Sequence, residues 1–281
     1  MTMTYLAFLI AFLLPPILLV YALLWRDQRR GGRPLEIRPV LALALVALVY
    51  TTPWDNYLVA NRVWWYRPDW VLGPTLAWVP LEEYAFFILQ TLLTGGWTLL
   101  VVRQLGGGGQ KEKAGGLCLR WTASLAAIAA WLVSTAALLA GPPQLTYLAL
   151  ILTWALPPLA LQAAFGADLL WKRAGTVLIS LGAPTIYLIL ADALAIRTGT
   201  WVINPDLSLS TRVAGFPLEE ALFFFVTNTL VVTGLILWAS HPGRARALAW
   251  LGRLGFGRDR QDSPSSGSLP AASAGGTHER A

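Results

Sequence analysis

Long apolar runs separated by short charged segments dominate this sequence and restrict it to a membrane fold. Each run comes close to the roughly 20 residues that a helix needs to cross a bilayer. Charged residues make up only 13% of the chain, whereas soluble domains carry roughly 25%. The sequence therefore predicts an all-α integral membrane protein with about seven transmembrane helices, at about 4–25, 36–54, 80–102, 118–140, 145–165, 175–196 and 216–239.

Lysine and arginine are distributed unevenly about these runs. The chain has 21 such residues, and all but Arg62, Arg67, Arg197 and Arg212 fall on one predicted side of the membrane. Because cytoplasmic loops collect basic residues, we expect a multi-pass protein of the cell's inner (plasma) membrane, with its N-terminus outside and its C-terminus cytoplasmic. The net charge of +6 then reflects topology, and we expect a lipid membrane rather than nucleic acid as partner.

Residues that commonly hold cofactors are scarce. The single cysteine, Cys118, and the two histidines, His241 and His278, give no metal-ligand pattern. The glycines at 106–109 lack the strand and helix that flank a dinucleotide-binding loop. No lysine lies in an apolar run, which argues against a retinal Schiff base. We therefore expect no metal and no cofactor.

The two halves of the chain resemble each other. Tyr5-Leu6-Ala7 recurs as Tyr147-Leu148-Ala149, and 11 of 24 ungapped positions are identical between residues 64–87 and 201–224. Each half contains three runs, and the fourth run between them restores the orientation of the copy. The sequence therefore predicts two parallel three-helix repeats joined by a linker helix. The predicted regions are a first repeat at 1–105, a linker and fourth helix at 106–140, a second repeat at 141–240, and a disordered basic cytoplasmic tail at 241–281.

A Pro-Leu-Glu-Glu motif occurs once in each repeat, at the start of the third and seventh runs. Proline favours the first position of a helix, so we expect Pro80 and Pro217 to open these helices. Acidic residues in a first turn commonly stabilise the helix N-terminus. Two motifs in register at the edge of a membrane span also suggest function, and a protonated glutamate could serve as a general acid. The four carboxyl groups are those of Glu82, Glu83, Glu219 and Glu220.

Other residues near the motifs are candidates for binding substrate or positioning the glutamates. Asp55 and Asp192 are matched in the two repeats and lie near the same membrane edge. Tryptophans such as Trp54 and Trp64 are expected mainly in the interfacial aromatic belt, although some could stabilise a carbocation beside the glutamates. The matched aromatic pairs that follow the motifs are Phe86 with Phe87 and Phe223 with Phe224.

The duplicated Pro-x-Glu-Glu in two three-span units resembles the membrane-integral lycopene cyclases, over roughly residues 1–240. Members of that family occur as two small subunits or as fused chains with an extra span, as here. The resemblance implies a lycopene β-cyclase of carotenoid biosynthesis that protonates a terminal double bond of lycopene, closes a six-membered ring and then loses a proton, without net redox change. The products would be γ-carotene and then β-carotene, and the four glutamates would supply acid and base.

Several alternatives remain at this point. Repeated glutamates at a membrane edge would also suit a proton- or cation-coupled transporter, and a non-catalytic partner subunit is a further alternative. Within the cyclase class, the sequence leaves open the ring type, a C50 substrate, one or two active sites, the roles of the individual glutamates and a homo-oligomeric state.

Overall fold

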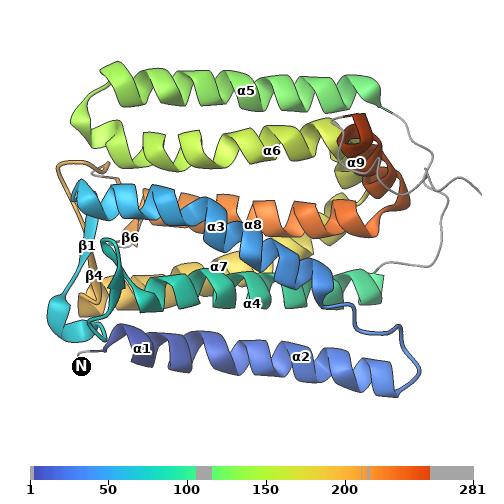
Figure 1. The fold of residues 1–281 in the computed structure, drawn as a ribbon, viewed down its shortest axis with the longest axis horizontal. Coiled ribbons are helices and arrows are strands. Elements are labelled where there is room, and N and C mark those ends of the chain that lie inside the picture. The colour runs from blue at the N-terminus through green and yellow to red at the C-terminus, as the bar shows by residue number, and fades with distance from the viewer. Residues whose placement is uncertain (1–2, 106–115, 210, 214–215, 254–281) are drawn as a thin grey trace, which may run out of the picture.

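The computed structural model describes residues 3–105, 116–209, 211–213 and 216–253, which form a bundle of long helices (Figure 1). A π-helical turn at Leu9–Leu13 joins α1 to α2, so that the two form one continuous span. The helices are α1 (Tyr5–Phe8), α2 (Leu14–Arg29), α3 (Arg38–Ala60), α4 (Leu81–Leu105), α5 (Leu117–Ala140), α6 (Thr146–Lys172), α7 (Ala174–Thr198), α8 (Leu218–Ala239) and α9 (His241–Arg253).

Six helical segments of the described residues are long and apolar enough to cross a membrane. The predicted second span corresponds to α3, which has 23 residues but is not among the six. Its second half contains Thr51, Thr52, Asp55 and Asn56, and these polar side chains lower its hydropathy. This less apolar span brings Asp55 into the bundle. The six are Tyr5–Arg29, Leu81–Leu105, Leu117–Ala140, Pro143–Lys172, Ala174–Thr198 and Leu218–Ala239.

Six short strands lie together at one end of the bundle, the strand end. Strands β1 (Trp64–Tyr66) and β4 (Trp201–Ile203) pair antiparallel, and each comes from a different half of the chain. Two hairpins lead directly into α4 and α8. The strands of these hairpins are β2 (Thr75–Leu76), β3 (Val79–Pro80), β5 (Arg212–Val213) and β6 (Phe216–Pro217).

Helix directions agree with the predicted parallel repeats. Helices α2, α4, α6 and α8 run away from the strand end, and α3, α5 and α7 run towards it (Figure 1). The unit α1–α4 and the unit α6–α8 therefore have the same orientation. Helix α5 lies at the edge of the bundle and packs mainly on α6, which suits its predicted role as a linker.

Polar side chains join the two units inside the bundle, along a stripe of α4 and α8. The Gln90 side chain donates to Thr227 Oγ1 at 2.8 Å, and Thr94 Oγ1 donates to Asn228 Oδ1 at 2.8 Å. Buried polar groups need such partners, because an unpaired one costs about 1–3 kcal/mol. The two halves are therefore tied together by hydrogen bonds as well as by apolar packing.

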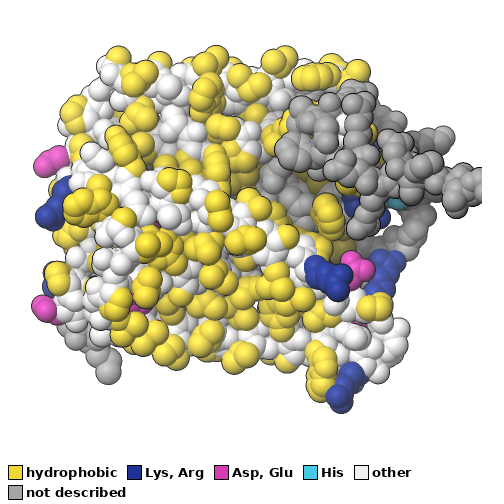
Figure 2. Space-filling model, in the orientation of Figure 1, with side chains coloured by type: hydrophobic (Ala, Val, Ile, Leu, Met, Phe, Trp, Pro, Cys, Tyr) yellow, Lys and Arg dark blue, Asp and Glu magenta, His cyan; other side chains and the backbone are white. Residues whose placement is uncertain are grey.

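The surface matches that of a membrane protein. Hydrophobic side chains cover the middle of the face that α3 crosses, and charged side chains lie towards the two ends (Figure 2). Exposed residues of α3 include Leu45, Val46 and Val49, each more than half exposed. An exposed apolar band of this kind is suited to lipid, and the protein is a multi-pass membrane protein.

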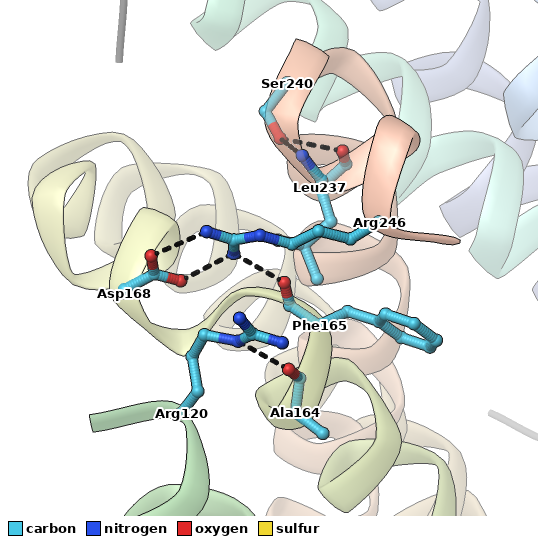
Figure 3. A network of polar contacts seen from close by, with 8 residues as sticks. Arg120, Ala164, Phe165, Asp168, Leu237, Ser240 and Arg246 are labelled. Carbon is cyan, nitrogen blue, oxygen red and sulfur yellow. Dashed lines mark hydrogen bonds and ion pairs between the residues drawn. The ribbon is translucent and has the colours of Figure 1, made fainter. Parts of the chain in front are cut away.

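The tail prediction is wrong for its first residues. Residues 241–253 form α9 rather than a disordered segment, whereas residues 254–281 lie outside the described residues. Arg246 of α9 donates to both carboxylate oxygens of Asp168 and to the Phe165 carbonyl, and Arg120 of α5 donates to the Ala164 carbonyl (Figure 3). A buried partner explains why this short, basic helix is ordered.

Close packing at Gly166 forms part of the same contact. A Cβ atom at this position would lie 2.2 Å from Leu237 Cδ2 of α8. The backbone of α6 is also non-helical at this residue, so the neighbouring carbonyls of Ala164 and Phe165 are left for the two arginines. Glycine thus permits both the close approach of α8 and the docking of α9.

Candidate active site

The two glutamate motifs begin α4 and α8 at the strand end. The prolines precede the helices instead of opening them: Pro80 and Pro217 end strands β3 and β6, and the helices start at Leu81 and Leu218. This differs from the prediction by one residue, because the hairpin strands already fix the backbone of each proline. The glutamates still fall in the first turn.

The first glutamate of each motif holds the loop that precedes its helix. Glu82 Oε1 accepts the backbone N–H of Leu72 at 2.5 Å, and Glu219 Oε1 accepts that of Leu209. The other oxygen of each carboxyl is buried without a hydrogen-bond partner. Leu72 and Leu209 occupy equivalent positions in the two repeats. These two glutamates therefore make equivalent loop contacts.

The second glutamate of each motif points into the bundle and meets a tyrosine from the first helix of its own unit. Tyr5 donates its hydroxyl to Glu83 Oε2 at 2.6 Å, and Tyr147 donates to Glu220 Oε1 at 2.5 Å. Both tyrosines are at most 1% exposed. Tyr5 and Tyr147, which begin the repeated Tyr-Leu-Ala segment, thus donate to equivalent carboxyl groups in the two units.

One donor breaks this symmetry. Tyr66 of β1 donates to the same Oε2 of Glu83 at 2.8 Å, whereas the equivalent position of the second repeat is Ile203. Desolvation on burial, with the charges of Asp55 and Glu83, raises the pKa of the Tyr66 phenol well above its usual value. The hydroxyl therefore keeps its proton at neutral pH and remains a donor.

Two aspartates stand beside these glutamates. Asp192 of α7 is a hydrogen-bonding neighbour of Glu220. Asp55 of α3 lies near Glu83 and beside the Trp64 indole. Two ionised carboxylates can only accept hydrogen bonds, so Asp192 and Glu220 can bond to each other only when one of them carries a proton.

All four carboxyl groups of this cluster, those of Asp55, Glu83, Asp192 and Glu220, are buried, and each aspartate lies within reach of the charge of a neighbouring glutamate. Burying a charge without a partner is expensive, and neighbouring like charges add to the cost. The cluster must therefore hold at least one proton, which is the property a general acid requires.

A small cavity of about 30 Å³ lies between the two units at this point. This is space for about one or two water molecules. Glu83 and Glu220 both line it, whereas Glu82 and Glu219 do not. The structure thus brings one glutamate of each motif to a single cavity. The remaining lining residues are Tyr5, Trp64, Tyr66, Phe86, Asp192, Trp201, Phe223 and Phe224.

Aromatic rings form most of the cavity wall and its surroundings. Phe223 stacks on Trp54 and packs edge-on against Phe224 and Trp64, with centroid distances of 5.4–6.4 Å. Trp64, which is 7% exposed, lines the cavity, and Trp54 packs against the same core, as expected for tryptophans placed beside the glutamates. Aromatic faces attract cations, so the wall suits a carbocation.

Sequence reasoning assigned no role to the tyrosines. Tyr5 and Tyr147 were visible as a matched pair, and this signal could have linked them to the matched glutamates. Tyr66 has no counterpart, so the repeat gave no indication of it. Of the other predicted residues, Phe87 is buried next to the site but lines a neighbouring groove instead of the cavity.

The fold and the site describe a membrane-embedded protein with a carboxylate-lined cavity shared by two repeats. A family profile described as lycopene cyclase matches residues 2–100 and 144–251, which leaves out α5. A lycopene beta-cyclase of Halobacterium salinarum is 41% identical over 240 residues, covering 85% of this chain and 97% of its own. The chain therefore belongs to the lycopene cyclase family.

Fungal relatives match part of a longer protein. A bifunctional lycopene cyclase/phytoene synthase of Aspergillus niger is 38% identical over 205 residues, covering 70% of this chain and 34% of the relative. A second bifunctional enzyme, of Arthroderma gypseum, is 36% identical over 248 residues, covering 84% of this chain and 41% of the relative. No solved structure matches the chain. The transporter alternative finds no support in these comparisons.

Proposed function

We propose that this protein is a lycopene β-cyclase, an enzyme that converts linear lycopene into a cyclic carotenoid. One observation supports this most strongly: a glutamate from each repeat lines one aromatic cavity inside a membrane protein. The family membership and the 41% identical lycopene beta-cyclase point to the same reaction. A hydrocarbon substrate can reach such a site from the bilayer.

The asymmetry of the cluster suggests separate roles for the two glutamates. Glu220, which shares a proton with Asp192, delivers that proton to the terminal double bond and forms a new C–H bond. The cation is attacked by a neighbouring double bond, which closes the ring through a new C–C bond. Glu83, with its two phenol donors, then accepts a proton from the ring carbon. One proton is gained and one is lost, so no oxidant or reductant is consumed.

The cavity would protect the intermediate. A carbocation in contact with water is captured as an alcohol, and excluding water prevents this side reaction. Phe223, Phe224 and Trp64 could attract the cation by about 1–2 kcal/mol each when desolvated. The proton held by Glu83 must return to the Asp192–Glu220 pair before the next ring closes.

Expression in a bacterial host that accumulates lycopene tests this function. Chromatography of the pigments should show γ-carotene and β-carotene with the unchanged protein. Glu83→Gln and Glu220→Gln should each lower ring formation by about 10²–10⁴-fold, the usual contribution of a general acid or base. Asp69→Asn provides a matched control, because Asp69 is exposed at the same end and should leave activity unchanged.

Failure of the starting strain to make any cyclic carotenoid would overturn the proposed function. Wild-type rates in both glutamine variants, at equal protein levels in the membrane, would overturn the assigned roles. A C50 substrate would appear as activity only in a host that supplies the longer polyene.

We also propose that the strand end faces outside and that the α9 end faces the cytoplasm of the inner membrane. The basic side chains of α9 and of the neighbouring helix ends support this orientation. Reporter fusions after residues 30 and 250 should report cytoplasm, and fusions near 65, 143 and 205 should report outside. A cytoplasmic signal at 65 would contradict the orientation.

A further inference from the structure

A second, larger groove lies beside the carboxylate-lined cavity and opens between α3, α6 and α8. Its volume is about 180 Å³. Phe223 lines both the cavity and this groove, so the two spaces meet at this side chain. At the strand end, the Tyr50 hydroxyl donates to the Trp154 carbonyl at 2.8 Å, and this contact joins α3 to α6 at the groove wall.

The groove continues towards the α9 end. A third hollow of about 660 Å³ lies between α3 and α8, and Leu43 and Val46 line both this hollow and the groove. Trp238 and Gly234 of α8 also line the third hollow. The cavity, the groove and the hollow therefore follow one another along α8. Phe223 lies where the cavity meets the groove, and Leu43 and Val46 lie where the groove meets the hollow.

The length of this path fits an extended chain. Glu220 at one end and Trp238 at the other lie on the same helix, and their spacing corresponds to about 27 Å at 1.5 Å per residue. This is close to the roughly 30 Å thickness of the hydrocarbon core. The groove wall is mainly apolar, with the aromatic residues Tyr50, Phe87 and Trp154. A short or polar ligand would use little of this surface.

We propose that the groove and the hollow hold the polyene of a linear carotenoid along α8, with one terminal isoprene unit directed past Phe223 to the carboxylate cavity, which widens to admit it. This proposal rests on the proposed function. Only one end of the substrate can then react in each binding event. The half-converted, monocyclic product leaves and binds again with its other end first, so that the two rings form in separate visits to one site.

Val46 offers a test that spares the catalytic residues. It is 59% exposed on α3 and lines both the groove and the hollow, so Val46→Trp should fill the path without disturbing the core. Leu45→Trp and Val49→Trp are matched controls, because these neighbours are 62% and 66% exposed and line neither space. Initial rates of lycopene loss are compared in membranes that contain equal amounts of each variant.

Val46→Trp should lower the rate at least tenfold, and both controls should stay within twofold of the unchanged protein. Binding is measured separately from turnover in the Glu220→Gln variant, which should not convert lycopene. In that variant, Val46→Trp should lower the amount of lycopene that copurifies with the protein. If Val46→Trp does not accumulate in the membrane, Val46→Phe replaces it. Addition of monocyclic carotenoid should slow the conversion of lycopene, because both compete for one site.

Equal rates and equal bound lycopene for Val46→Trp and the controls would overturn the proposal and would mean that the groove holds only membrane lipid. Failure of the unchanged protein to cyclise lycopene at all would instead refute the proposed function. The two failures are therefore distinguishable. Formation of both rings without release of monocyclic carotenoid into the membrane would contradict the separate visits.

Discussion

Removal of the Tyr66 hydroxyl would test whether the two halves of the site have different tasks. Tyr66→Phe deletes one of two donors to Glu83 Oε2 and keeps the ring, which stacks on Tyr5 with centroids 6.0 Å apart. A hydrogen bond to a charged group contributes about 1.5–3 kcal/mol. At about 1.4 kcal/mol per tenfold change in rate, ring formation should fall by about 10- to 150-fold.

The assay measures initial rates of lycopene loss in membranes, with a substrate deuterated at the carbon that loses its proton. If Glu83 is the base, Tyr66→Phe should increase the deuterium isotope effect, because fewer molecules then hold Glu83 in the ionised form that removes the proton. Tyr147→Phe, which deletes the donor to Glu220, should lower the rate without that increase. Tyr57→Phe is the control, since Tyr57 is 53% exposed on α3.

Two results would refute this reasoning. A rate for Tyr66→Phe equal to that of Tyr57→Phe would mean that the second donor does not matter to the reaction. A larger isotope effect in Tyr147→Phe than in Tyr66→Phe would reverse the roles of the two glutamates.

Further predictions concern the loops and the opposite end of the bundle. Glu82→Gln keeps an acceptor for the Leu72 N–H, so its rate of ring formation should stay within about tenfold of the unchanged protein. Glu82→Ala removes the acceptor and should lower the rate further. Equal rates for the two variants would contradict the role of Glu82 in holding the loop. Asp168→Ala leaves Arg246 without its buried partner and should cost about 3–5 kcal/mol, measured as a lower unfolding temperature in detergent. Gly166→Leu should destabilise similarly through overlap with Leu237, whereas Gly175→Leu, at an open position, should not.

The lengths of the apolar runs and the internal repeat predicted most of the architecture, because both patterns can be recognised in the sequence itself. The predictions failed where contacts between residues distant in sequence outweigh these patterns. Helix α9 is short and basic, and its order is explained by contacts with residues distant in sequence, Asp168 and Phe165. Tryptophan is a residue type enriched at the membrane interface, yet Trp54 stacks on Phe223 and Trp154. Helix α3 is less apolar than a typical span because part of it faces the site.

The candidate site was predicted in part. Duplication identified all four glutamates, but only the fold separates the two that line the cavity from the two that hold loops. Spacing alone places both members of each pair in one helical turn and cannot show which of them faces inward. Tyr66 belongs to one repeat only, so a comparison of the halves could not reveal it.

The antiparallel pairing of β1 with β4 has a consequence for the assembly of the enzyme. One strand comes from each unit, and each unit also supplies one glutamate to the cavity, so neither unit alone has a complete site. A covalent connection turns the meeting of the two units into an intramolecular event, at an effective concentration of about millimolar for a short flexible link. Helix α5, which touches mainly α6, would then act as a tether: coexpressed halves, severed between α4 and α5, should regain activity in proportion to their density in the membrane.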